Sequence, residues 1–263
     1  MNDADPPFSE RAPEAWTFHR HSSRWAFNTL TPGTDDTPEP GRELAGARFL
    51  ALPAPEPVDV GLCDAIGRRC SARAFAADPL GLEALSALLH WTAGSLGPVR
   101  LGAMEMLRRP APSAGGMYAL EYYVIARNVA GIEPAIYHYQ PVGHGLEEVR
   151  DAVPPRALSD YLFMGQPYVT QAAAAIVVTA MFGRSLKKYR DRGYRYLLIE
   201  TGHAAQNLML CAAGLGLGTC GIGGFFDVEL AQLLRLDVAR ELPLYAIACG
   251  PAQADPEDAG PGA

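Results

Sequence analysis

Apolar residues that recur every three or four positions predict helices in the middle of the chain. Leu82, Leu85, Leu88 and Leu89 share one face of such a helix. Gly94 follows the last apolar residues of this pattern and supplies the end of the helix. The stripe therefore predicts a helix that packs its leucines against a core.

Three further stretches have helical periodicity. A short helix is expected over 59–67, and another over 228–234 with Asp227 as its N-cap. The longest pattern covers 194–213 and is apolar nearly all round in its second half. A helix of this kind is central in its domain or lies in a subunit interface.

Aromatic and β-branched residues dominate four other segments, which predict strands over 121–126, 135–139, 174–180 and 244–249. A turn is expected around Gly131, between the first two strands. The strands alternate irregularly with helices, which argues against a barrel or a sandwich. The sequence therefore predicts the α+β class, without internal repeats.

The two ends of the chain differ from its middle. Residues 1–58 are rich in Pro, Gly, Thr and Asp and have no lasting period, so we expect an extended arm. Residues 251–263 have the composition of a disordered tail. A single domain is expected over 59–250.

Charge and composition exclude several classes of protein. The chain of 263 residues has 22 Lys and Arg against 29 Asp and Glu, a net charge of −7, which argues against nucleic-acid binding. Its longest apolar run, 172–182, is shorter than the ~20 residues of a membrane helix, and its first residues do not resemble a secretory signal. The 5 cysteines form no C-x-x-C pair, so we expect neither a disulfide framework nor a metal site. These features predict a cytoplasmic protein.

The first segment with candidate chemistry is a cluster of guanidinium groups. Arg68, Arg69 and Arg73 lie within six residues, together with Cys70 and the hydroxyl of Ser71. Arginines are bidentate donors of fixed charge and suit a phosphate-bearing ligand. A solvated basic turn explains the same residues equally well.

The second segment is Pro112, Ser113, Ala114, Gly115 and Gly116. Small residues and a glycine pair let a backbone approach a flat ligand closely. Taken alone, the segment is explained as a loop that enters the strand at 121–126.

The third segment, 214–225, is rich in glycine and contains Gly216-x-Gly218-x-x-Gly221. This spacing matches the dinucleotide fingerprint, which has meaning only between a strand and a following helix. Here a helix precedes it and a strand or loop follows, so we reject a Rossmann fold. We expect the glycines to end the helix and to present backbone N–H groups to a ligand.

The fourth segment, 187–196, is charged and aromatic and includes Lys188 and Tyr189. An ammonium group beside a phenol suits proton transfer in a partly buried pocket. A solvated helix entry is the alternative. No G-x-S-x-G motif or other nucleophile signature is present.

In this order and spacing, the four segments resemble those of the nitroreductase-like flavoproteins. More narrowly they resemble the SagB-type dehydrogenases, which oxidise azoline rings in peptide natural products. The matching stretches are 68–75, 112–124, 188–207 and 214–225, and the strand pair within 135–149 fits as well. Two positions depart from the family pattern: Ala119 replaces a usual Pro, and Cys70 a common Ser.

The resemblance implies a nitroreductase-like α+β fold with a central, mainly antiparallel sheet flanked by helices. It also implies a homodimer with a long buried helix at the interface. FMN is the implied cofactor, with its phosphate and ribityl chain bound by the cluster at 68–73 and its ring approached by 112–116 of the partner subunit. The glycines implied beside the flavin are Gly221, Gly223 and Gly224, and the pair implied in catalysis is Lys188 and Tyr189, with Tyr189 as base.

The function implied is oxidation of a thiazoline or oxazoline, or of a related ring or amino-acid unit, in natural-product biosynthesis. The substrate would be a peptide or small molecule, oxygen the final electron acceptor, and a cyclising enzyme a possible partner. Basic residues are absent after Gly250, which favours this branch over quinone-reducing relatives. An NAD(P)H-dependent nitro or quinone reductase is one alternative, and a flavin-free scaffold subunit of the same fold is another.

Overall fold

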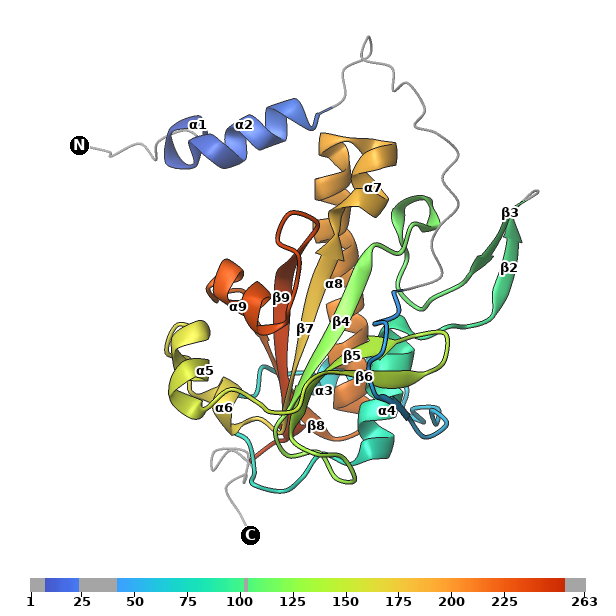
Figure 1. Cartoon of the computed structure of the whole chain (residues 1–263), viewed down its shortest axis with the longest axis vertical. Helices are drawn as coiled ribbons and strands as arrows, with labels where there is room; N and C mark the ends of the chain where they lie inside the picture. Colours follow the sequence, from blue (N-terminus) through green and yellow to red (C-terminus); the bar gives the residue numbers. More distant parts are fainter. Residues whose placement is uncertain (1–7, 24–41, 102–103, 254–263) are drawn as a thin grey trace.

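The computed structural model describes residues 8–23, 42–101 and 104–253. In this part, seven strands form one antiparallel sheet in the order β1-β6-β5-β4-β7-β9-β8 (Figure 1). The strands are β1 (Phe49–Ala51), β4 (Leu120–Ala126), β5 (Ala135–Gln140), β6 (Gly145–Arg150), β7 (Ala174–Met181), β8 (Leu217–Ile222) and β9 (Glu241–Pro251). A separate hairpin, β2 (Pro98–Leu101) and β3 (Met104–Leu107), projects from the body. The antiparallel sheet and the α+β class are confirmed.

Helices cover both faces of the sheet, because its central strands are apolar on both sides. One face packs against α4 (Leu82–Ala93) and α8 (Asp191–Gly214), and the other against α5 (Arg156–Leu162), α6 (Tyr168–Gln171) and α9 (Asp227–Leu233). Tyr122 and Val124 point to the first face, and Tyr123 and Ile125 to the second. This alternation is the two-residue period of a strand.

The sheet has two ends that matter for the site. At the upper end in Figure 1, β4 begins and β7 finishes, with Leu120 opposite Ala180. At the lower end Ala174 lies opposite Cys249, which in turn pairs with Thr219 of β8. The six-residue step along β7 between these ends corresponds to about 20 Å.

Two helices link the ends of the sheet to the rest of the chain. The helix α7 (Phe182–Tyr189) continues from β7 at the upper end, and α8 follows it and precedes β8. With 24 residues, α8 is about 36 Å long and spans the whole sheet. The short helix α3 (Leu62–Arg68) packs against α8.

The expected N-terminal arm is only partly extended. It contains α1 (Phe8–Arg11) and α2 (Pro13–His21), and β1 pairs with β6 at the edge of the sheet. The helix α2 was not predicted, because its apolar residues show only weak helical periodicity and none of its residues is buried. Its last turn is bound instead by arginines of α8: Arg195 donates to the carbonyl of His19 and Arg192 to that of Ser22.

The prediction placed the start of the disordered tail too early in the chain. Pro251 belongs to β9, Ala252 pairs with Phe75, and the N–H of Gln253 donates to the carbonyl of Ala74. Residues 254–263 of that prediction lie outside the described residues. The first residues of the segment are ordered because β9 extends the sheet past the last apolar position.

Several expected boundaries also shift. The helix expected at 59–67 is α3, which begins at Leu62, and Asp227 is the first residue of α9 instead of its N-cap. The helix expected at 194–213 is α8, which already begins at Asp191. No described helix is long and apolar enough to cross a membrane.

Candidate active site

The arginine cluster lies beside the glycine-rich segment, at the lower end of the sheet. Ser71 forms a parallel bridge with Thr219 of β8, and the N–H of Ala72 donates to the Thr219 carbonyl at 2.9 Å. The two segments are almost 150 residues apart in sequence, so only the tertiary fold unites them. We call this group, 68–73 with 217–224, the lower half-site.

The guanidinium groups of the lower half-site are available to an anion. Arg68 and Arg73 are exposed, and Arg69 is half-buried. Among the described residues, no carboxylate lies within ion-pair distance of these three arginines. Cys70 and Ser71 are exposed between them. This donor set fits the phosphate of a flavin nucleotide.

The glycines of the lower half-site have different surroundings. A Cβ atom on Gly223 would meet nothing within 4 Å, so its face is open to a flat ligand. The carbonyl of Gly224 accepts a hydrogen bond of 2.9 Å from Gln166 Nε2. A Cβ atom on Gly221 would collide with the Tyr245 hydroxyl, so packing explains the glycine there.

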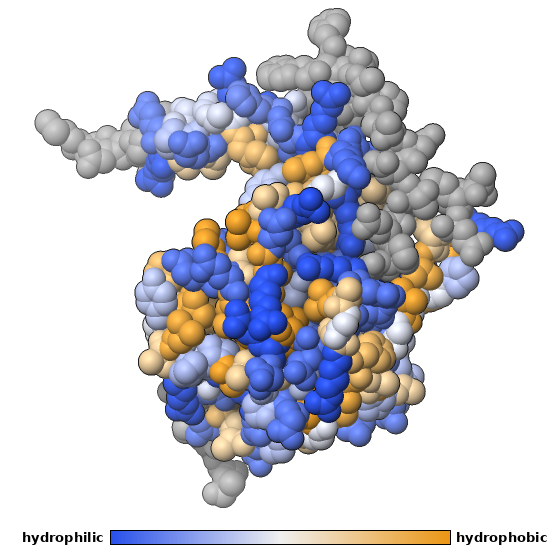
Figure 2. Space-filling view, in the orientation of Figure 1, coloured by the Kyte–Doolittle hydropathy of each residue, from blue (hydrophilic) through white to orange (hydrophobic). Residues whose placement is uncertain are grey.

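An apolar surface adjoins the open glycine. It is formed by exposed side chains of α5, α9 and the segments that follow or precede them: Leu158, Tyr161, Met164, Phe226 and Val228. The rings of Tyr161 and Phe226 stack with their centroids 4.8 Å apart. Figure 2 shows hydrophobic residues over α5 and α9 in this region.

The second and fourth segments meet at the upper end of the sheet. Gly115 has a left-handed backbone (φ 64°), and a Cβ atom there would collide with the Tyr189 hydroxyl and lie 3.0 Å from Lys188 Nζ. Both side chains are half-buried in the last turn of α7. The ring of Tyr189 packs edge-on against Tyr196 of α8. We call this group, 112–118 with Lys188 and Tyr189, the upper half-site.

The break between α7 and α8 orients this pair. Arg190 separates the two helices with φ 50°, a left-handed conformation that is uncommon outside glycine. Lys188 Nζ lies 5.6 Å from the centre of the Tyr189 ring. The segment 187–196 therefore contains a helix–break–helix, which places Lys188 and Tyr189 beside Gly115.

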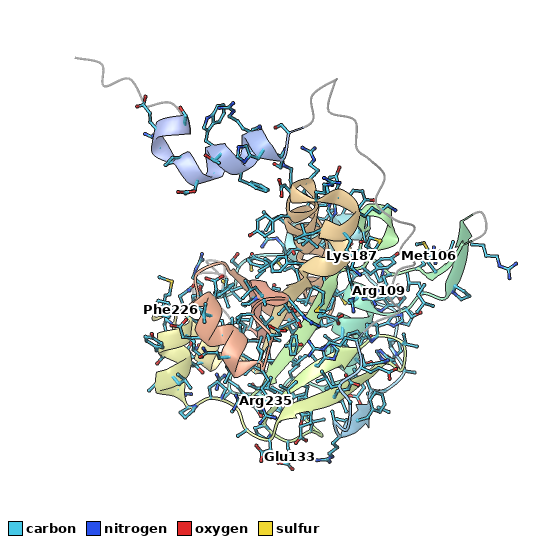
Figure 3. The ribbon with its side chains drawn as sticks, turned by 45° about the horizontal axis from the view of Figure 1, so that its top comes forward. Met106, Arg109, Glu133, Lys187, Phe226 and Arg235 are labelled. Atoms are coloured by element: carbon cyan, nitrogen blue, oxygen red, sulfur yellow. The ribbon has the colours of Figure 1, made fainter. Side chains whose placement is uncertain are left out.

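Glu200 of α8 belongs to the upper half-site, although no motif or spacing in the chain singled it out. Its Oε2 accepts a hydrogen bond of 2.7 Å from Ser113 Oγ, and only 6% of the residue is exposed. Burial raises the pKa of Glu200 to about 7, against the lowering effects of Ser113 and the Arg109 guanidinium. Figure 3 shows Arg109, Met106 and Lys187 on the same side of the molecule.

A buried charge cluster supports the upper half-site from the sheet. Arg184 of α7 donates to Glu121 Oε1 at 2.6 Å and to the carbonyl of Tyr118 at 3.2 Å. His138 lies between two carboxylates, 3.0 Å from Glu121 and 2.8 Å from Glu147. These residues come from three strands and a helix, so spacing along the chain could not reveal the cluster.

The arginine cluster and the upper half-site lie at opposite ends of the sheet. The arginine cluster lies at the level of Thr219, and the upper half-site lies beyond Leu120 and Ala180, about 20 Å further along the strands. The glycines of the lower half-site lie between these levels, because Ile222 pairs with Ala246, which lies opposite Val177. Within one chain, the arginines are therefore separate from Lys188 and Tyr189.

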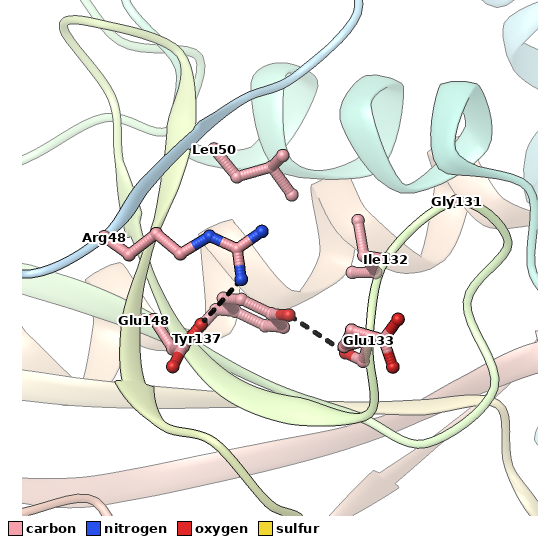
Figure 4. A pocket seen from close by; sticks show the side chains of 7 residues that line it. All are labelled: Arg48, Leu50, Gly131, Ile132, Glu133, Tyr137 and Glu148. Carbon is pink, nitrogen blue, oxygen red and sulfur yellow. Dashed lines mark hydrogen bonds and ion pairs between the residues drawn. The ribbon is translucent and has the colours of Figure 1, made fainter.

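A pocket elsewhere on the sheet has no comparable chemistry (Figure 4). It lies beside β5 and β6, where Arg48 faces Glu148 at 3.6 Å and the Tyr137 hydroxyl donates to the carbonyl of Glu133 at 2.9 Å. The Arg48 guanidinium and the Tyr137 hydroxyl are thus already paired within the pocket. In the described part of the chain, no cluster of His, Cys, Asp and Glu is suited to hold a metal ion.

Comparison with known proteins places this geometry in a family. A putative nitroreductase of Methanocaldococcus jannaschii is 32% identical over 201 residues, which cover 76% of this chain and 96% of that protein. The microcin B17-processing protein McbC of Escherichia coli is 34% identical over 147 residues, about half of each chain (52% and 52%).

Solved structures agree. A putative nitroreductase from Anabaena variabilis superposes with a TM-score of 0.73 and 26% identity, covering 96% of this chain and 49% of that one. The Escherichia coli microcin synthetase McbBCD complex, with a truncated precursor bound, contains a chain of the same fold, with a TM-score of 0.59 and 22% identity over 97% of this chain and 85% of that one. The nitroreductase family model matches residues 66–251. The chain belongs to the nitroreductase family.

Proposed function

We propose that this protein is an FMN-dependent dehydrogenase that oxidises an azoline ring, or a related ring or amino-acid unit, in the maturation of a natural product. Support comes from membership of the nitroreductase family and from the likeness to McbC, a microcin-processing protein. FMN, when bound, would supply the acceptor for two electrons. This chain would bind the cofactor, orient the substrate and remove the proton.

The observation that carries the proposal is the separation of the arginine cluster from Lys188 and Tyr189 within one chain. A homodimer that brings the lower half-site of one copy against the upper half-site of the other would complete two sites at once. The outer face of α8 is suited to such an interface, because its apolar residues Leu198 and Ile199 are 43% and 49% exposed.

Each half-site would have its own task. Arg68, Arg69 and Arg73 would hold the phosphate, and the open face at Gly223 would lie against the flavin ring. The apolar surface around Tyr161 would face the substrate. Cyclisation must precede the oxidation, so we propose a cyclising enzyme as the partner that supplies the ring.

Proton removal falls to the upper half-site. Conversion of an azoline to an azole removes two hydrogens from adjacent ring atoms, one as a proton and one with its electron pair. Tyr189, as its phenolate, would take the proton and become the neutral phenol, and the nearby Lys188 ammonium would stabilise the phenolate before the transfer. Gly115 leaves this hydroxyl accessible, because any side chain there would collide with it.

The cofactor test uses the visible spectrum of the purified chain. We expect a flavin absorption band and release of FMN on denaturation. A double substitution, Arg69→Ala with Arg73→Ala, should abolish the band, and Arg235→Ala, an exposed arginine just after α9, should leave it intact. A colourless wild-type protein that fails to bind added FMN would overturn the assignment.

The reaction test uses a thiazoline-containing peptide. Tyr189→Phe should retain FMN and lose oxidation, whereas Tyr137→Phe, at the pocket beside β5 and β6 and outside both half-sites, should retain both. Unchanged turnover in Tyr189→Phe would remove Tyr189 from the mechanism.

A reductase that takes electrons from NAD(P)H is the second candidate, because the Methanocaldococcus relative, matched over nearly its whole length, is a putative nitroreductase. Rapid mixing with NADPH separates the two. Fast bleaching of the flavin band supports the reductase, and a persistent band supports the dehydrogenase.

A further inference from the structure

The helix α7 contacts the loop of the upper half-site, residues 112–118, at two points. At the first point, Lys188 and Tyr189 lie against Gly115. At the second, Arg184 Nη1 donates a hydrogen bond of 3.2 Å to the carbonyl of Tyr118. Arg184 precedes Lys188 by four residues, so both side chains leave the same face of α7, one turn apart. The spacing of the two contacts is therefore set by one helical turn.

The carbonyl that Arg184 binds belongs to a strained residue. Tyr118 has φ 44°, a left-handed conformation that is uncommon and costly outside glycine. Its N–H donates to Ser113 Oγ at 2.9 Å, and its hydroxyl accepts a hydrogen bond of 3.2 Å from the N–H of Arg109. Hydrogen bonds thus hold Tyr118 at three groups, and the bond at its carbonyl comes from a charged donor, which strengthens it.

The position of the Arg184 guanidinium is itself determined by the sheet. The same Nη1 atom lies 2.6 Å from Glu121 Oε1 in β4, and only 7% of the residue is exposed. Glu121 is bound in turn by His138 of β5, which Glu147 of β6 holds from the other ring nitrogen. Three neighbouring strands therefore fix the cation that reaches the loop.

We propose that Arg184 is a positioning residue that holds the loop of the upper half-site against Lys188 and Tyr189. It acts through the carbonyl of Tyr118 and keeps that residue in its left-handed conformation. This attachment is a property of the chain itself. Only its consequence for azoline oxidation rests on the proposed function.

Two substitutions separate the two contacts of the guanidinium. In Arg184→Lys, a single ammonium group prefers the ionised Glu121 to a neutral carbonyl, so we expect the ion pair to remain and the bond to Tyr118 to be lost. Glu121→Gln does the opposite, because it removes the ion pair and leaves Arg184 in place to bind the carbonyl. Arg240→Lys, an exposed arginine paired with Asp237, is the matched control.

Hydrogen exchange of the full-length protein at one pH compares the loop with the sheet. The amides of Gly116 and Tyr118 report on the loop, and that of Val124, buried in β4, reports on the sheet. In Arg184→Lys, loop protection should fall about tenfold or more, because the loop can leave the left-handed conformation that forms these hydrogen bonds. Val124 should change little. In Glu121→Gln, Val124 should lose more protection than the loop, because a buried cation has lost its anion.

Acetylation gives a second readout, because Lys187 and Lys188 are the only lysines of the 263-residue sequence. Lys187 is exposed and serves as the internal reference for the half-buried Lys188. In the wild type and in Glu121→Gln, the Lys188 amine should react more slowly than that of Lys187. In Arg184→Lys the two rates should converge, with the amine introduced at position 184 resolved by peptide mapping.

Three results would overturn the proposal. The first is loop protection in Arg184→Lys that equals that of the wild type and of Arg240→Lys. The second is a parallel loss at Val124 in Arg184→Lys, which would make the role of Arg184 purely structural. The third is an equal loss of loop protection in Glu121→Gln, which would show that the ion pair holds the loop and the carbonyl contact does not.

Turnover tests the consequence for the reaction once an azoline substrate is found. Arg184→Lys should lower kcat about ten- to a hundredfold with little change in KM, because the reacting groups are misplaced while the substrate surface around Tyr161 is intact. An unchanged kcat would contradict the positioning role. A wild-type protein that oxidises no azoline would refute the proposed function and leave the exchange result standing.

Discussion

Two buried glutamates of this chain, Glu121 in β4 and Glu200 in α8, have nearly the same exposure (1% and 6%) and opposite electrostatics. Burial opposes the charge of both. At Glu121, the hydrogen bonds and charges of His138 and Arg184 outweigh burial and lower its pKa. At Glu200, a serine hydroxyl and Arg109 do not, and its pKa rises to about 7.

The difference shows that burial alone does not determine the charge of a carboxylate; the balance between burial and the cations and hydrogen-bond donors around it does. His138 follows the same logic with the opposite sign. Burial works to lower its pKa, but Glu121 and Glu147 together raise it. The charge cluster is thus a fixed ionic support, whereas Glu200 changes charge near neutral pH.

The largest expected effect comes from removing the shared cation of the cluster. His138→Phe leaves Glu121 and Glu147 buried without it, and we expect a loss of about 3–5 kcal/mol in the free energy of unfolding. Denaturant titration measures this loss, with Glu200→Gln as the matched substitution that should not weaken the fold. A loss below about 1 kcal/mol would show that the cluster is not ionised as described.

The next largest effect is expected in the pH dependence of the free energy of unfolding, to which Glu121 and Glu200 should contribute in opposite directions. Glu200 has a raised pKa, so its favourable contribution is present below 4.5 and is lost as the pH rises to about 7. Glu200→Gln should therefore be more stable than the wild type by up to about 3 kcal/mol at about pH 8, and by little at about pH 5. Glu121 has a lowered pKa, and its contribution should be lost in acid instead.

Thermal unfolding of the wild type and Glu200→Gln across this pH range measures the difference. Equal stability of the two proteins at alkaline pH would mean that Glu200 is hydrated in the folded state. That result would also remove the contrast with Glu121.

A smaller effect is expected at the glycine between loop and helix. Gly115→Ala places a methyl group against Tyr189 in a left-handed conformation, and we expect a loss of about 2 kcal/mol. Gly165→Ala has a similar φ (73°) with nothing within 4 Å, so it should cost only the backbone strain of about 1 kcal/mol. Equal losses, measured by thermal unfolding, would show that Gly115 does not contact Tyr189 closely.

Much of the fold was predictable, because many of its helices and strands have a recognisable periodicity or composition within their own segments. The stripe of Leu85, Leu88 and Leu89 gave α4, and aromatic or β-branched runs gave β4, β5, β7 and the core of β9. The helix α2 was missed, because it is held by contacts with Arg192 and Arg195 of α8, which its own sequence does not contain. The start of the tail was misjudged for the same reason: its order comes from the pairing of Ala252 with Phe75.

The candidate site likewise contains residues that could be predicted from the sequence and residues that could not. The sequence singled out the arginines at 68–73, the two glycine segments and Lys188 with Tyr189, since rare groupings of residue types are visible in one dimension. It did not single out Glu200 or His138, because a glutamate in a helix and a histidine in a strand are ordinary residues until burial changes their chemistry.

Periodicity and local composition act between near neighbours, so many of the helices and strands and the short runs of candidate chemistry could be recognised in the amino-acid sequence alone. The pairing of the arginine cluster with β8, the contact of Gly115 with Tyr189, and the opposite pKa shifts of Glu121 and Glu200 belong to the folded chain. They could not be predicted, because strand register and desolvation depend on residues brought together from distant parts of the chain.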